Sequence, residues 1–166
     1  MINTKEIESP MSLSNQFGDN FNIIVNNMFN FFNNYGNNIG KQKVLSYFDE
    51  QNITLQEINN LLLNDQNNSN SIYLLGKFNH LGIGISVNNK KAFELYQKAA
   101  KLGNAFGINN LGNCYENGIG TDIDKKKAFE LYQKAVELGN AFGINNLGCC
   151  YENGIGSRIR KCIWNK

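Results

Sequence analysis

The sequence predicts an all-α protein, an α/α superhelical solenoid of helix-turn-helix repeats with an N-terminal helical cap. Two observations predict this fold. One segment recurs along the chain at a fixed offset of 36 residues, and each copy carries apolar residues at helical spacing. A helical hairpin of this size cannot bury its apolar faces alone, so the copies are expected to stack on one another.

The repeat is nearly identical in its best copies. Segment 104–120 recurs at 140–156, where only Asn113 changes, to Cys149. Glycines keep the same register. One position in the middle of each first helix is Gly76, Gly112 and Gly148. Because glycine inside a helix costs up to about 1 kcal/mol relative to alanine, its recurrence indicates that a neighbouring helix approaches closely there.

Each unit is predicted to consist of two helices, which in the second copy span residues 105–117 and 125–138. Apolar residues recur every three or four positions in both segments, so each helix has one face to bury. Gly118 is expected to end the first helix, because glycine adopts the left-handed conformation found at helix ends. Asp124 is expected to cap the second helix, and Gly139 to end it.

The chain divides into six segments by register and pattern. They are a disordered N-terminus at 1–15, a helical N-terminal cap at 16–67, repeat one at 68–103, repeat two at 104–139, partial repeat three at 140–156 and an atypical basic tail at 157–166. Within the cap, helices are expected at 20–35 and 41–51 with a loop between them, and a capping box at Thr54 and Glu57 begins a third. The cap is expected to cover the open end of the solenoid.

The residues of the second unit form a specific pattern. It runs Leu111-Gly-x-x-Tyr115-x-x-Gly118-x-Gly120 and continues as Asp124-x-x-Lys127-Ala128-x-x-x-Tyr132-x-Lys134-Ala135. This pattern resembles the Sel-1-like repeat, an α/α relative of the tetratricopeptide repeat. The resemblance covers residues 68–156 and departs from the pattern in the first unit, where Asn79 replaces the motif tyrosine. The cap also resembles the connector before such arrays in some fungal proteins, where a protein-kinase-like domain precedes it, but no kinase residues are present here.

Neither charge nor hydropathy favours a nucleic-acid or membrane partner. The net charge is +2, which excludes a strongly basic protein that wraps nucleic acid. The longest apolar runs are far too short to span a membrane, and the N-terminus lacks the apolar core of a signal peptide. We therefore expect a soluble protein of the cytoplasm that binds neither nucleic acid nor membrane.

No constellation of catalytic or metal-binding residues is recognisable. His80 is the only histidine, and one histidine cannot supply a typical zinc site. Gly82-Ile-Gly84 follows a predicted helix rather than a strand and recurs in every unit, so it is interpreted as a repeat turn and not as a phosphate-binding loop. The sequence therefore predicts no enzyme activity, no cofactor and no metal ion.

The cysteines are interpreted as free thiols. Cys114 and Cys150 share one register position, so they are expected to lie about 10 Å apart, the usual distance between packed helices. This distance is too long for a disulfide, and both side chains are expected to be buried. Cys149 is expected to point toward the opposite face, and Cys162 lies in the tail.

The polar faces of the first helices are predicted to line the concave groove of the solenoid and to bind a peptide or a partner protein. By register, the groove candidates are Tyr73, Lys77 and His80; Asn109, Asn113 and Glu116; and Asn145, Cys149 and Glu152. Such amides can hydrogen-bond an extended peptide without strong charge selectivity. The resemblance implies a non-enzymatic adaptor or scaffold for protein–protein interaction, often in signalling.

Self-association is the alternative function. The third unit stops after its first helix, so Ile144, Leu147 and Tyr151 are expected to have an uncovered side. One occupant of that side would be the tail, through Ile159, Ile163 and Trp164. The other would be a second copy of the chain, which predicts a homo-oligomer formed through the open C-terminal end.

Overall fold

The structure is a computed structural model that describes residues 11–155 of the 166-residue chain, with side chains from residue 20 onward. The described part contains helices and no strand, as the sequence predicts. The helices are α1 Met11–Gln51, α2 Leu55–Asn64, α3 Ser69–Leu81, α4 Asn89–Lys101, α5 Ala105–Asn117, α6 Lys125–Glu137 and α7 Ala141–Glu152. The expectations for residues 1–10 and for the tail at 157–166 lie outside the described residues.

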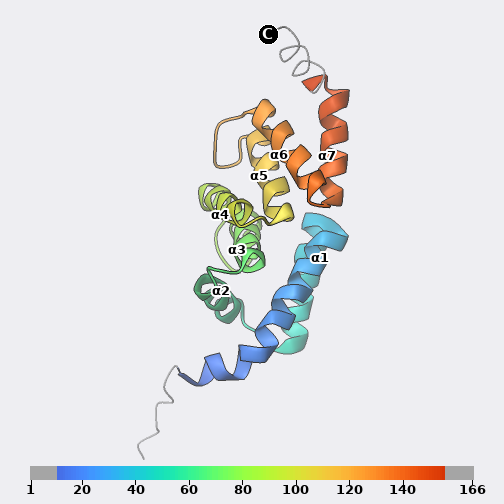
Figure 1. Cartoon of the computed structure of the whole chain (residues 1–166). Helices are drawn as coiled ribbons and strands as arrows, with labels where there is room; N and C mark the ends of the chain where they lie inside the picture. Colours follow the sequence, from blue (N-terminus) through green and yellow to red (C-terminus); the bar gives the residue numbers. More distant parts are fainter. Residues whose placement is uncertain (1–10, 156–166) are drawn as a thin grey trace, which may run out of the picture.

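Helices α3 to α7 form a stack in which each helix packs on the next one along the chain. Figure 1 shows the stack from α3 in green to α7 in red, with α1 alongside it. The pairs α3/α4 and α5/α6 are complete helical hairpins, and α7 is the first helix of a third unit. Adjacent units thus bury the apolar faces that one hairpin alone would leave in water.

The ends of the repeat helices follow from local side-chain chemistry. Asn104 caps α5, where its side-chain oxygen accepts a hydrogen bond from the backbone N–H of Gly107. Gly118 ends α5 in the left-handed conformation, with φ of 70°. Asp124 caps α6 and accepts from the backbone N–H of Lys127. These predictions are confirmed, except that α6 ends one residue earlier than expected, at Glu137.

The mid-helix glycines mark the close approach that their register predicts. A Cβ atom on Gly76 would lie 2.7 Å from Cε1 of Tyr96, in α4. A Cβ atom on Gly112 would likewise lie 2.7 Å from Cε1 of Tyr132, in α6. Since carbon atoms in contact lie about 3.5–4.0 Å apart, only glycine lets the tyrosine ring sit on the backbone.

Helix α1 is a hairpin of two helical arms that meet at Gly36. This glycine has φ of 70° and ψ of −165°, a conformation that leaves the helix for one residue. The arms 11–35 and 37–51 then lie side by side. Asn27 Nδ2 of the first arm donates to Tyr47 Oη of the second at 3.1 Å. The predicted loop at 36–41 was wrong, since only Gly36 departs from helical angles. The first arm also begins earlier than expected, at Met11.

Helix α2 begins at the capping box that the sequence predicts. The Thr54 hydroxyl accepts from the backbone N–H of Glu57, and the Glu57 carboxylate accepts from the backbone N–H of Thr54. Both α1 and α2 pack on α3. The cap and the repeats therefore share one continuous core, which includes Met28, Phe48, Ile58, Leu62 and Phe78.

Candidate functional site

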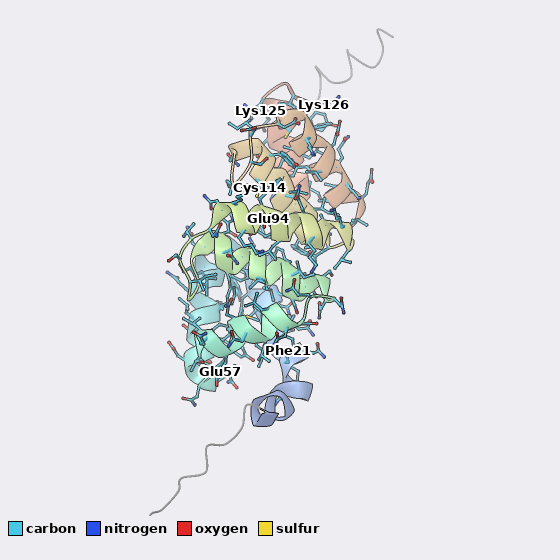
Figure 2. The ribbon with its side chains drawn as sticks, turned by 90° about the vertical axis from the view of Figure 1, so that its left-hand side faces the viewer. Phe21, Glu57, Glu94, Cys114, Lys125 and Lys126 are labelled. Carbon is cyan, nitrogen blue, oxygen red and sulfur yellow. The ribbon has the colours of Figure 1, made fainter. Side chains whose placement is uncertain are left out.

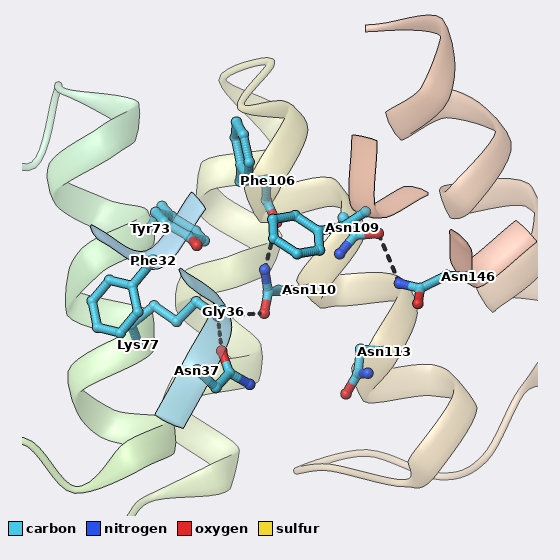
Figure 3. A pocket seen from close by; sticks show the side chains of 11 residues that line it. Phe32, Gly36, Asn37, Tyr73, Lys77, Phe106, Asn109, Asn110, Asn113 and Asn146 are labelled. Atoms are coloured by element: carbon cyan, nitrogen blue, oxygen red, sulfur yellow. Dashed lines mark hydrogen bonds between the residues drawn. The ribbon is translucent and has the colours of Figure 1, made fainter. Parts of the chain in front are cut away.

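The first helices of the three units, α3, α5 and α7, line one pocket. We call their surfaces at this pocket the first-helix face. The pocket has a volume of about 180 Å³. Figure 3 shows its side chains from α3, α5 and α7 together with the tip of the α1 hairpin. The lining residues are Phe32, Gly36, Asn37, Tyr73, Lys77, Phe106, Asn109, Asn110, Asn113, Phe142 and Asn146.

A buried cation, Lys77, lies at one end of the pocket. Its side chain is 4% exposed, and its Nζ atom donates to Asn37 Oδ1 at 2.5 Å and to Asn110 Oδ1 at 3.1 Å. The rings of Phe32 and Tyr73 lie 5.5 Å and 5.6 Å from Nζ, within range of a cation–π interaction. No carboxylate in the described part of the chain forms an ion pair with it. Burial therefore lowers the pKa of Lys77 to about 7.

Side-chain amides continue from Lys77 along the pocket. Asn110 Nδ2 donates to the backbone carbonyl of Phe106 at 2.8 Å, so this amide is held in place while its oxygen faces Lys77. Between the first helices of the second and third units, Asn146 Nδ2 on α7 donates to Asn109 Oδ1 on α5 at 3.0 Å. The half-buried side chain of Asn113 lines the pocket and makes no hydrogen bond to another described side chain. The amide of Asn113 is therefore not occupied by another described side chain.

An aromatic row borders the same pocket. The ring of Phe29, in the first arm of α1, meets Phe106 edge-on with centroids 4.9 Å apart and Tyr73 with centroids 5.6 Å apart. Phe142 of α7 follows Phe106 at 6.5 Å. The first arm of α1 therefore lies across the α3 end of the first-helix face and reaches Phe106 of α5, while among the described residues no ring contact joins this arm to α7. The expected cap at the end of the solenoid thus reaches onto the face predicted to bind partners.

Comparison with known proteins identifies the repeats. The sequence model of the Sel1 repeat matches residues 69–104, 105–140 and 141–161, together more than half of the chain. The chain belongs to the Sel1 repeat family. Repeats of this family generally serve as scaffolds for protein–protein interaction. No match was found among curated proteins.

Solved structures with Sel1-type folds resemble this one. A Sel1 repeat protein from Oxalobacter formigenes is 30% identical with a TM-score of 0.59, over 66% of this chain and 46% of its own. Helicobacter pylori cysteine rich protein B is 22% identical with a TM-score of 0.57, over 82% of this chain and 98% of its own. A protective antigen of uropathogenic Escherichia coli with an SLR fold is 22% identical with a TM-score of 0.53, over 88% and 37%. The chain thus spans less than half the length of the first and third of these proteins.

The structure brings together only part of the predicted groove of the Sel1 repeats. Tyr73, Lys77, Asn109 and Asn113 line the pocket, although Tyr73 and Lys77 are buried beneath α1. The other candidates lie elsewhere. These are His80 and Glu116, which face second helices, and Asn145, Cys149 and Glu152, which are exposed on α7 outside the pocket.

His80 and Glu116 occupy equivalent positions next to a tyrosine hydroxyl. His80 Nδ1 lies 3.4 Å from Tyr96 Oη, and Tyr132 Oη donates to Glu116 Oε2 at 2.7 Å. Burial, and then the charge of Lys77, lower the pKa of His80. Both side chains are half-buried. They therefore connect the two helices of one Sel1 unit and do not reach the pocket.

Sequence reasoning missed most of the pocket wall. Its missed members from the repeats form two register pairs, Phe106 with Phe142 and Asn110 with Asn146. Their recurrence at an offset of 36 residues was a signal that could have found them. The members from the cap, such as Phe32 and Asn37, had no such signal, because only the folded position of α1 brings them to the repeats.

The cysteines of the Sel1 units are free thiols in the described part of the chain. Cys114 and Cys150 are buried, as predicted, and Cys149 is exposed. Figure 2 shows Cys114 within the stack, while Lys125 and Lys126 lie at its surface. Burial raises the pKa of Cys114 to about 12, so this thiol is a poor nucleophile and a poor metal ligand.

The described residues contain neither a cluster of metal ligands nor a helix that could span a membrane. Within residues 11–155, no three histidine, cysteine or acidic side chains gather as a metal site would require. None of the helices in that range is both long enough and apolar enough to cross a lipid bilayer.

Proposed function

We propose that this chain is a non-enzymatic adaptor that binds an extended peptide segment of a partner protein in the pocket of the first-helix face. The proposal rests chiefly on the pocket itself, which α3, α5 and α7 line with amides and aromatic rings. Amides can donate to and accept from a peptide backbone, and ring faces can pack on its side chains. The proposed adaptor works in the cytoplasm without a cofactor and binds neither nucleic acid nor membrane.

The α5 and α7 end of the pocket is the part that a peptide would reach first. Asn113 is half-buried and its amide is free of other described side chains. Phe142 is also half-buried and lines the same pocket. The α3 end is already filled by the α1 hairpin, in which the Asn37 oxygen accepts a hydrogen bond from Lys77 Nζ. A bound segment would therefore run from α7 toward the hairpin tip.

A peptide library displayed on phage and panned against the intact chain tests this proposal. The enriched peptides would be synthesised with a fluorescent label, and their affinities measured by anisotropy. We expect Asn113→Ala to weaken binding about fivefold, since one hydrogen bond contributes about 1 kcal/mol. Asn145→Ala is the matched control, because Asn145 is an exposed amide of α7 that does not line the pocket.

Two outcomes would remove the groove assignment. One is a set of peptides whose affinity is unchanged by Asn113→Ala. The other is an equal loss in the Asn113→Ala and Asn145→Ala chains, which would place the binding surface on the exposed side of α7. Circular dichroism of both variants checks that the helices are intact.

Self-association through the open C-terminal end is the second candidate function, and one observation favours it. Ile144 on α7 is 60% exposed, whereas its register equivalents Ile72 and Ile108 are buried. Contact with a second copy would remove this surface from water. Light scattering over a range of concentrations tests this function, and a monomer at the highest concentration would exclude it.

A further inference from the structure

The outer face of α7 has the sequence of a buried face but is exposed. Ile72, Ile108 and Ile144 occupy one register position, and their exposed fractions are 0%, 1% and 60%. In the first two units the second helix, α4 or α6, packs on the first helix. No helix of the described range 11–155 packs in the corresponding place on α7.

The centre of this face is a glycine with no ring on it. At Gly76 and Gly112, an added Cβ would lie 2.7 Å from a tyrosine ring of the second helix. At Gly148, the register equivalent, an added Cβ would meet no atom within 4 Å, and the residue is exposed. On α7 the same sequence thus leaves open the space that a tyrosine ring fills in each of the two other units, and we call this open space at Gly148 the hollow.

A polar group borders the hollow where the tyrosine hydroxyl would be. In the second unit, Tyr132 Oη donates to Glu116 Oε2 at 2.7 Å. In the first unit, Tyr96 Oη lies 3.4 Å from Nδ1 of His80. Glu152 is the equivalent residue of α7, and its side chain is exposed. The hollow therefore offers both a bare backbone for the ring and an acceptor for the hydroxyl.

We propose that the outer face of α7, defined by Ile144, Gly148 and Glu152, is a docking site for an α-helix of a partner protein that presents a tyrosine with an alanine one turn before it. The two internal second helices supply the template, in the pairs Ala92/Tyr96 and Ala128/Tyr132, all 0% exposed. Residues four apart lie on one helix face, so both side chains would meet α7 together. The small alanine allows the partner helix to approach closely.

A second copy of the chain fits this face less well than a foreign helix. The tyrosines that match the hollow, Tyr96 and Tyr132, are buried within their own units and are not available to another molecule. If two α7 faces met across a two-fold axis, they would place glycine opposite glycine near the axis, with no ring to fill either hollow. This site is also separate from the pocket, to which α7 contributes Phe142 and Asn146.

The test uses a synthetic peptide with the sequence of residues 124–138, acetylated and amidated, added to the intact 15N-labelled chain at up to millimolar concentration. We expect chemical-shift changes centred on Ile144, Gly148 and Glu152. Changing tyrosine to phenylalanine in the peptide removes one hydrogen bond to a charged acceptor and should weaken binding about tenfold. Changing tyrosine to alanine should abolish binding.

Variants of the intact chain complete the test. Gly148→Ala places a methyl group where the ring would sit, and we expect it to weaken peptide binding at least tenfold. Its helix should remain intact, because alanine favours the helix. Asn145→Ala and Asn113→Ala are controls that should leave the affinity unchanged. The second control separates this site from the pocket, so the two proposals can fail independently.

Three outcomes would overturn the proposal. Shift changes centred on Gly112 would mean that the peptide exchanges with α6 of the chain itself. Unchanged affinity in the Gly148→Ala chain would place the peptide elsewhere. Binding that occurs only after residues 157–166 are deleted would show that the chain's own C-terminal segment occupies the face.

Discussion

Lys77 of α3 donates a hydrogen bond to Asn110 of α5, so a buried ammonium group joins the first helices of two neighbouring repeat units at a distance of 3.1 Å. Its second acceptor, Asn37, belongs to the α1 hairpin. Neutral amide oxygens, and no carboxylate among the described residues, thus surround a charge that is 4% exposed. One desolvated amino group therefore joins the cap and two units.

The first prediction concerns the pH dependence that this lysine causes. Burial lowers the pKa of Lys77 to about 7 from 10.5, so above pH 7 the unfolded chain binds more protons at this residue than the folded chain. The free energy of unfolding should then rise with pH between about 7 and 10.5, by at most about 1.4 kcal/mol per unit. The Lys77→Met chain should lack this contribution. Urea denaturation at several pH values measures the free energy of unfolding of the unchanged chain and of the Lys77→Met chain. If the difference between the two free energies does not change with pH, the prediction fails.

The second prediction concerns a matched pair of glycine substitutions. Gly112→Ala should destabilise the fold by about 1–3 kcal/mol, because the new methyl group would collide with the ring of Tyr132. Gly148→Ala should instead stabilise the fold by up to about 1 kcal/mol, because the position is open and alanine favours the helix. Thermal denaturation of the two variants compares them directly. Equal effects would mean that the two positions do not differ in packing.

The third prediction concerns the contact between the cap and the repeats. The rings of Phe29 and Phe106 meet edge-on at 4.9 Å, and such pairs contribute about 0.5–1.5 kcal/mol beyond area burial. A double-mutant cycle with Phe29→Ala and Phe106→Ala should therefore give a coupling energy of about 1 kcal/mol. Phe93 and Tyr115, which meet at 5.3 Å away from the cap, provide a reference cycle. A coupling near zero for the first pair would show that the hairpin does not rest on α5.

The fourth prediction concerns the capping box of α2. Thr54→Ala should cost about 1 kcal/mol of stability, the usual value of an N-cap side chain. Hydrogen bonds from the Thr54 side chain and backbone lower the pKa of Glu57, so the same variant should raise that pKa toward 4.5. This carboxylate contributes stability above its unfolded pKa, and the contribution is lost as the pH falls through the folded value. An NMR titration of the Glu57 side chain measures the pKa, and an unchanged value would contradict the proposed cause.

Local sequence rules predicted the repeat part of the fold because the interactions there are local in sequence. Asp124 and Gly118 mark helix ends through their own backbone neighbours. The glycine register indicated a close approach, and the partner proved to be a tyrosine twenty residues later in the same unit, as with Gly112 and Tyr132. Such contacts repeat with the sequence where both helices of a unit are described, so the register predicts them at Gly76 and Gly112, whereas the close approach expected at Gly148 was wrong.

The candidate site was predicted only in part, because it depends on contacts between distant segments. Asn109 and Asn113 both line the pocket, although Asn109 is buried and its oxygen accepts from Asn146; their role in binding stays a prediction. Glu116 lies one turn after Asn113, yet its side chain turns toward Tyr132 of α6. Asn37 contacts Lys77 in the pocket although the two residues are forty positions apart in the sequence. No pattern in either segment predicts that contact. The position of the α1 hairpin is a property of tertiary packing alone.

The contacts within one Sel1 unit and those between units are made by different residues, and this division has a mechanical consequence. The tyrosine on the mid-helix glycine holds each hairpin together, whereas small residues join one hairpin to the next, as where Gly107 lies against Ala99 and Gly143 against Ala135. Among the described helices, α7 packs only on the preceding unit, so it should be the first of the repeat helices to fray when the molecule is heated or pulled from its ends. Hydrogen exchange would then spread along the array from that end, while the hairpins of α3/α4 and α5/α6 open last.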